Sequence, residues 1–147
     1  MHMESKFPII YPETLLRAAI FADAEANSAL RREHIDITFT QYRILRTIGD
    51  GTSVPVAIAH QLAVSHPAMS RHLKNLEAAK LITRAVNENV RREHHIELTK
   101  KGAALRKEAE QVLAKHLRKT FTSISPSARM SALTTLEKTI AACAHIE

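Results

Sequence analysis

The sequence contains only one cysteine, three glycines and no tryptophan. A lone cysteine, Cys143, cannot form a disulfide within the chain, and the glycines form neither of the loop motifs that hold nucleotide phosphates. No stretch approaches the roughly 20 apolar residues of a membrane-spanning helix, and the first residues show no signal-peptide pattern. We therefore expect a cytoplasmic protein with no membrane partner and no cofactor.

The positive charge is concentrated in one contiguous third of the chain. Residues 60–107 contain ten Lys or Arg against four Glu, which accounts for the whole net charge of +6, whereas the rest holds eleven residues of each sign. Net charge indicates partners rather than fold, so this asymmetry favours a polyanion. Because all six aromatic residues lie outside the segment, it offers no base-stacking platform, which favours duplex DNA over single strands or RNA.

A short basic helix is predicted after Val64. Ser65 is a typical helix cap, and Pro67 is tolerated in a first turn. The helical period places Met69, Leu73 and Leu76 on one face and small or cationic residues on the opposite face, which can enter a DNA major groove. The predicted DNA-contacting residues of this helix are Ser65, His66, Pro67, Ala68, Ser70, Arg71 and Lys74.

Three helices are predicted before this one. Pro12 suits the first turn of a helix with an alanine-rich apolar surface. Thr38 and Gln41 have the spacing of a capping box for a helix that ends near Gly49. Pro55 opens a short helix that gives way at residues 63–65 to the basic helix, and the two together predict a helix-turn-helix.

The hydrophobic period changes after the basic helix. Residues 81–86 and 94–98 alternate like two strands, and the polar segment between them carries Arg91 and Arg92. Thr99 then caps a long helix, and Ser125 caps a final one. The 147 residues, 45% hydrophobic and 24% charged, are ordinary for one globular domain. We predict a single, mainly α domain with a small β-hairpin over residues 1–147.

The residues Val64-Ser65-x-Pro67-x-x-Ser70-Arg71, together with Leu98-Thr99-x-x-Gly102, resemble the MarR family of winged helix-turn-helix transcriptional regulators. The resemblance implies a homodimer joined by flanking helices in residues 11–35 and 100–145. It implies a DNA-binding part over residues 38–99, with a wing at about 82–98 whose Arg91 and Arg92 enter the minor groove. The implied function is an effector-responsive repressor that binds an inverted repeat. Tyr42, Phe39, Phe21 and Arg43 are effector-pocket candidates by family analogy alone.

Two residues depart from the family pattern. Ala63 stands in the turn where glycine is frequent, and Lys80 stands after the recognition helix where glycine is usual. We expect both backbones either to avoid positive φ or to be somewhat strained.

Other classes of function remain open. No HExxH or CxxC pair supports a metal site, although His34, His116 and His145 are candidates to approach one another in a dimer, so a metal-responsive regulator is an alternative. Cys143 allows a redox-responsive one, but its place beside Ile140 favours a buried or interfacial structural cysteine.

An enzyme or a helical adaptor is the remaining alternative. Glu93, His94, His95 and Glu97 are raw material for acid–base chemistry, but strand alternation divides them between two faces and no nucleophile motif accompanies them. A helical adaptor would leave the basic helix and hairpin unexplained. We expect no catalytic residues and no metal ligands.

Overall fold

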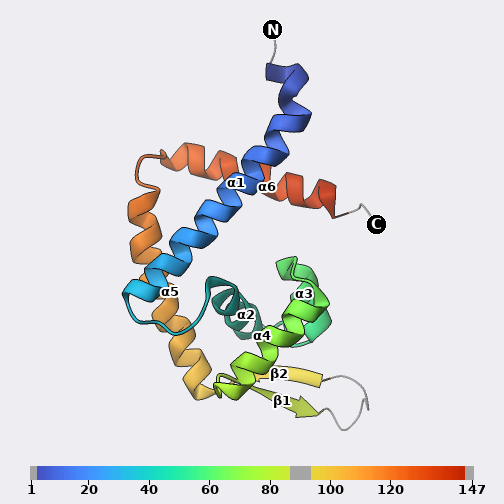
Figure 1. Cartoon of the computed structure of the whole chain (residues 1–147), viewed down its shortest axis with the longest axis vertical. Helices are drawn as coiled ribbons and strands as arrows, with labels where there is room; N and C mark the ends of the chain where they lie inside the picture. The colour runs from blue at the N-terminus through green and yellow to red at the C-terminus, as the bar shows by residue number, and fades with distance from the viewer. Residues whose placement is uncertain (1–2, 87–93, 145–147) are drawn as a thin grey trace.

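The computed structural model describes residues 3–86 and 94–144, and it contains helices and one antiparallel hairpin (Figure 1). Helices α2 to α4 and the hairpin form a lower lobe in this view. Helix α5 runs along its side, and α1 and α6 cross at the other end of the molecule. The elements in chain order are α1 (Met3–Arg32), α2 (Phe39–Gly49), α3 (Pro55–Leu62), α4 (His66–Ala78), β1 (Ile82–Val86), β2 (His94–Leu98), α5 (Lys100–Thr120) and α6 (Pro126–Cys143).

The lower lobe folds as the local sequence signals predict. Thr38 and Gln41 form the predicted capping box: the Gln41 amide donates to the Thr38 hydroxyl at 3.2 Å, and the Thr38 amide donates to Gln41 Oε1 at 2.9 Å. The apolar faces of α2, α3 and α4 meet in one core with the base of the hairpin and the inner side of α5. Its largest fully buried side chains are Leu30, Ile44, Leu45, Ile58, Met69, Leu76 and Ile96.

The hairpin is attached to both neighbouring parts of the lobe. Its register pairs Ile82 with Leu98 and Val86 with His94. The Ile96 amide donates to the Ser53 carbonyl at 2.8 Å, and Ser53 Oγ lies 2.8 Å from His95 Nδ1, so the segment before α3 is hydrogen-bonded to β2. The base of the predicted wing is therefore held by hydrogen bonds as well as by core packing.

The start of α5 lies against the chain segment that leaves α4. The Thr99 hydroxyl donates to the Lys80 carbonyl at 2.7 Å and accepts from the Gly102 amide at 3.0 Å. This confirms Thr99 as the predicted cap. Gly102 is buried against the Leu81 backbone, and a Cβ at Gly102 would lie only 1.9 Å from the Leu81 carbonyl oxygen.

The prediction that the first helix begins near Pro12 is wrong, because α1 begins at Met3 and both Pro8 and Pro12 lie inside it. Each proline removes one helical donor, which normally weakens a helix interior. Two contacts favour the longer helix. The rings of Phe7 and Tyr11 stack with centroids 4.7 Å apart, and Tyr11 Oη lies 2.8 Å from Thr139 Oγ1 of α6.

Of the two expectations for the turns at Ala63 and Lys80, the structure supports a strained backbone rather than avoidance of positive φ. Ala63 has φ 52° and Lys80 has φ 60°, so both occupy the left-handed region that favours glycine. The tertiary structure requires this, because each residue reverses the chain at the end of a helix. The Val64 amide donates to the Ala59 carbonyl at 3.0 Å, and the Leu81 amide donates to the Leu76 carbonyl at 2.9 Å.

Replacing Ala63 by glycine is expected to raise the free energy of unfolding by about 1 kcal/mol, because it removes the left-handed penalty of an L-residue. Urea denaturation measures this change. Ala57→Gly is the matched control, since Ala57 lies within α3 and the same change there should lower stability by about 1 kcal/mol. Destabilisation by both substitutions would show that the Ala63 conformation carries no strain.

Candidate nucleic-acid interface

Helix α4 presents the predicted basic face to solvent. Ser65 caps it, with Oγ accepting from the Ala68 amide at 3.4 Å, and Met69, Leu73 and Leu76 are buried as predicted. Arg71 and Lys74 are exposed and make no ion pair within the described part of the chain. Both cations are therefore free to meet an external anion. Of the other predicted contacts, Ser65, His66, Pro67 and Ser70 are exposed, whereas Ala68 is half-buried.

His72 does not add to this positive charge. It is half-buried on α4, and burial, together with the charge of Arg71, lowers the pKa of its imidazole from the usual 6.5. A lowered pKa keeps the ring neutral at neutral pH. The charge of the exposed α4 face therefore comes from Arg71 and Lys74.

One ion pair joins α4 to the hairpin. Nε of Arg84 on β1 lies 3.2 Å from Oε2 of Glu77 in the last turn of α4. The sequence analysis missed this pair. Its signal was weak, because it joins a strand to a helix seven residues earlier without a fixed spacing.

The tip of the predicted wing lies outside the described residues. Arg91 and Arg92 belong to residues 87–93, as does Glu93 of the acid–base alternative. The minor-groove role of the two arginines therefore stays a prediction.

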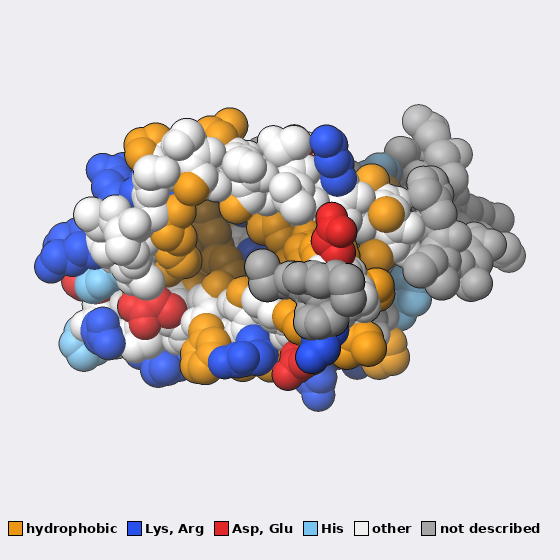
Figure 2. Space-filling model, turned by 90° about the horizontal axis from the view of Figure 1, so that it is seen from above, with side chains coloured by type: hydrophobic (Ala, Val, Ile, Leu, Met, Phe, Trp, Pro, Cys, Tyr) orange, Lys and Arg blue, Asp and Glu red, His pale blue; other side chains and the backbone are white. Residues whose placement is uncertain are grey.

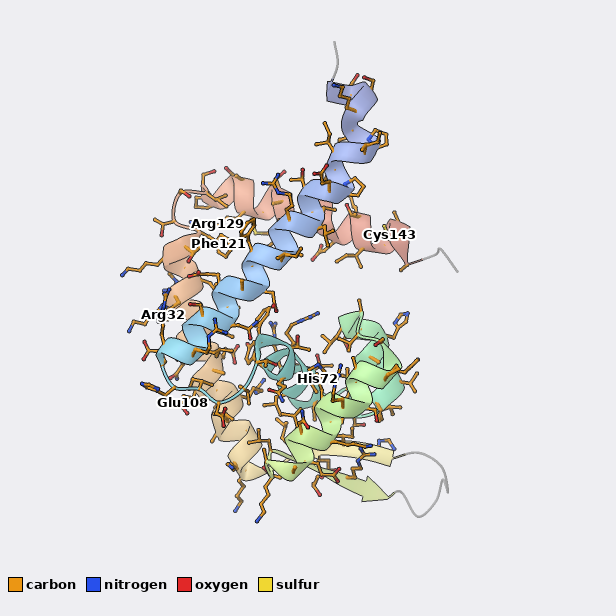
Figure 3. All side chains as sticks on the ribbon, in the orientation of Figure 1. Arg32, His72, Glu108, Phe121, Arg129 and Cys143 are labelled. Atoms are coloured by element: carbon orange, nitrogen blue, oxygen red, sulfur yellow. The ribbon has the colours of Figure 1, made fainter. Side chains whose placement is uncertain are left out.

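Of the histidines considered for a metal site, His34 and His116 lie in the described part of the chain and His145 lies outside it, so their approach in a dimer stays a prediction. Within residues 3–86 and 94–144, no three His, Cys, Asp or Glu side chains are placed to share a metal ion. His116 Nε2 instead lies 3.1 Å from Glu33 Oε1, and this hydrogen bond lowers the pKa of the Glu33 carboxyl. Figure 3 shows Cys143 at the end of α6, and its side chain is exposed in the single chain rather than buried. An interfacial place and a redox role for Cys143 both stay predictions.

A hollow of about 520 Å³ lies between α2, α5 and the start of α6. Phe39 and Tyr42, two of the four effector-pocket candidates, line it, and burial raises the pKa of the Tyr42 hydroxyl. Phe21 and Arg43 do not line it, since Phe21 is exposed on α1 and Arg43 donates to the Leu62 carbonyl at 3.1 Å. The sequence analysis missed the cations that border the hollow, which are Arg46, Arg118 and Arg129.

Arg129 also fixes the corner between α5 and α6. Its guanidinium donates to the Ile124 carbonyl at 2.7 Å and to the Phe121 carbonyl at 2.9 Å. Figure 3 shows Arg129 and Phe121 together at this corner. Beyond the corner, α6 has no buried side chain, and Met130, Leu133, Leu136 and Ile140 are exposed in the single chain. Figure 2 shows hydrophobic side chains gathered around a depression when the molecule is viewed from above.

Comparison with known proteins points to one family. The sequence model of the family described as "MarR family" matches residues 35–93, which contain α2 to α4 and β1. No curated protein matches the chain by sequence.

Solved structures resemble nearly the whole chain. A cysteine-to-serine variant of MarR from E. coli, complexed with operator DNA, is 22% identical with a TM-score of 0.81, covering 92% of this chain and 96% of its own. The regulator BldR from Sulfolobus solfataricus is 20% identical with a TM-score of 0.83, covering 96% and 98%. MepR of S. aureus, in complex with DNA, is 25% identical with a TM-score of 0.76, covering 90% and 97%.

The described residues include no helix that is long and apolar enough to cross a bilayer. The winged helix-turn-helix, its basic α4 and the matches over residues 35–93 and over the whole fold agree with one another. Residues 35–93 thus match the MarR family, and the chain as a whole has the winged helix-turn-helix fold of the solved regulators that it resembles.

Proposed function

We propose that this protein is a homodimeric, effector-responsive repressor that binds an inverted repeat in duplex DNA. The observation that carries the proposal is α4, a capped helix whose buried stripe fixes it to the core. Its outward face presents Arg71 and Lys74, which have no ion-pair partner among the described residues. An α-helix with its side chains is about 10–12 Å across, which matches a major groove about 12 Å wide. Helix α4 is then the recognition helix, with Arg71 closest to base edges.

Related structures support DNA as the partner. MarR and MepR, which share this fold, were solved with DNA, and the repressor CouR was solved with a 23-mer duplex. In our proposal, Ser65, His66, Pro67, Ala68 and Ser70 contact the same groove or its phosphates. Arg91 and Arg92 of the wing reach the adjacent minor groove, where arginine responds to groove width and A·T content.

Exposed apolar side chains on α1 and α6 support a homodimer. Isolated protomers rarely leave so many large apolar residues in water without a partner. These residues occupy the flanking helices of residues 11–35 and 100–145 and extend to the start of α1. They are Phe7, Ile9, Ile10, Leu16, Ile20, Phe21, Met130, Leu133, Leu136 and Ile140.

The function is tested by selecting bound sequences from a random duplex DNA pool at near-physiological salt. Two recognition helices related by a two-fold axis should enrich an inverted repeat whose half-sites lie about one helical turn apart. A folded protein that enriches no motif would contradict sequence-specific regulation and favour a non-specific DNA binder or an adaptor.

Leu133→Glu is expected to convert the dimer to monomer and to abolish binding of the inverted repeat. Each dimer would bury two new charges, which costs ~3 kcal/mol or more of dimerisation free energy in total. The dissociation constant of the dimer therefore rises at least about 150-fold. Sedimentation velocity measures the change. The control is Ser131→Glu, which adds the same charge on the opposite face of α6, so it should remain dimeric. Equal dissociation by both variants would place the interface elsewhere.

The hollow between α2 and α5 is our proposed effector site. Its volume of about 520 Å³ lies within the usual 300–1,000 Å³ range of small-molecule sites. Its lining combines aromatic walls with three arginines and one acid, which are Arg46, Arg118, Arg129 and Glu110. Aromatic rings beside a net positive charge suit a ligand with an apolar body and an anionic group. NadR, which shares the fold, was solved with 4-hydroxyphenylacetate. The duplex obtained by selection provides the assay in which such compounds can be screened for release of DNA.

A further inference from the structure

A small recess opens between α4, the start of α3 and β1. Its volume is about 120 Å³, well below the roughly 300 Å³ at which small-molecule sites begin. It therefore suits a single chemical group rather than a whole ligand. Three of its lining side chains carry hydrogen-bond donors, from His66, Ser70 and Arg84, and the others are Pro55, Val56, Met69 and Leu73.

The donors at this recess are available to an external group. His66 and Ser70 are exposed, and neither side chain has a partner among the described residues. Arg84 contacts Glu77 through Nε, at 3.2 Å. Among the described residues, its two terminal nitrogens have no hydrogen-bond partner. The recess thus lies in the most basic third of the chain with unused donors at its rim.

The recess lies beside the face of α4 that carries Arg71 rather than on that face. His66, Ser70 and Glu77 follow one line along the helix at intervals of four and seven residues. Arg71 is offset from Ser70 by one residue, which is about 100° around the helix. A helix that fills the major groove has bases in front of it and a sugar–phosphate backbone on each side. This flank, with Arg84 of β1 against it, therefore faces phosphate when Arg71 faces bases.

We propose that Arg84, together with Ser70 and His66, binds one DNA backbone phosphate at this recess, and that Glu77 competes with that phosphate for the Arg84 guanidinium. The inference rests on the proposed function and adds a contact outside the recognition helix. Glu77 then lowers the affinity for DNA, because the DNA phosphate must displace the Glu77 carboxylate from Arg84. Sequence preference is unaffected, since the phosphate is common to all base pairs.

The test measures affinity for two fluorescent duplexes, one carrying the selected inverted repeat and one of random sequence, over a range of salt concentrations. Arg84→Gln is expected to weaken binding to both duplexes about 5- to 10-fold and to lower the salt slope by about one per protomer. Glu77→Gln is expected to tighten binding to both about 3- to 10-fold, because it frees Arg84 and removes a negative charge close to the phosphate.

Opposite signs for the two substitutions are the distinguishing result. If the pair only fixes β1 to α4, both variants should bind more weakly and unfold at lower temperature, and this outcome overturns the proposal. Two controls carry the same charge changes at exposed residues away from the recess, namely Glu97→Gln on β2 and Lys107→Gln on α5. If these controls match their counterparts, only overall charge matters and the phosphate contact is excluded.

The same measurements separate this proposal from the proposed function. Failure of the wild-type protein to bind either duplex would contradict the function itself. Binding of the wild type, with Arg84→Gln and Glu77→Gln unchanged from it, would leave the regulator in place and reject the Arg84 contact alone.

Discussion

Replacing Gly102 by alanine is expected to lower the free energy of unfolding by about 3 kcal/mol or more, although alanine is the better helix former. A Cβ at this position would lie 1.9 Å from the Leu81 carbonyl oxygen and 2.8 Å from its carbon. Both are backbone atoms, so no side-chain rotation can relieve the clash. The start of α5 and the segment after α4 must move apart, which disturbs the hydrogen bonds from Thr99 to Lys80 and Leu81.

The matched control is Gly49→Ala at the last residue of α2. A Cβ there meets atoms at 3.2 Å or more, and these belong to the side chains of Arg106 and Leu98. Flexible side chains can yield by a few tenths of an ångström, so the expected change is within about 1 kcal/mol. Urea denaturation monitored by circular dichroism compares the two variants. Similar losses for both would show that close approach at Leu81 is not what requires glycine.

The helix-turn-helix and the hairpin were predictable because their signals are local. The caps at Thr38, Ser65 and Thr99 each lie within three residues of the amide that they accept from. The buried stripe of α4 repeats at the helical period, and strand alternation marks the hairpin. Such features need no knowledge of distant parts of the chain.

The predictions that failed or were missing depend on tertiary contacts. Local signals predict a start of α1 at Pro12, but the helix begins at Met3, and Tyr11 in its added part contacts Thr139, 128 residues away. The left-handed conformations of Ala63 and Lys80 follow from chain reversals required by packing rather than from residue preference. The recess at Arg84 and the hollow bordered by Arg46 and Arg129 each bring together three elements, and no spacing rule predicts such a meeting.

Replacing Arg71 by alanine is expected to weaken binding of the selected inverted repeat by about 1–3 kcal/mol per contact, which is roughly 5- to 150-fold. Arg71 lies opposite the buried stripe of α4, where a long cationic side chain with paired donors reaches guanine edges. Binding to random duplex should fall much less, because that affinity depends on phosphates. Repeating the selection with the variant should show relaxed preference at one base pair in each half-site.

Lys74→Ala is the companion variant, since Lys74 is exposed on the same face and carries the same charge one turn later. An ammonium is a point charge that suits a phosphate, so its loss should weaken binding to cognate and random duplexes alike and lower the salt slope by about one per protomer. The two variants thus separate base recognition from charge on a single helix. If both lose affinity equally for the two duplexes, Arg71 contributes only charge. Sequence preference must then come from other α4 residues or from the shape of the DNA.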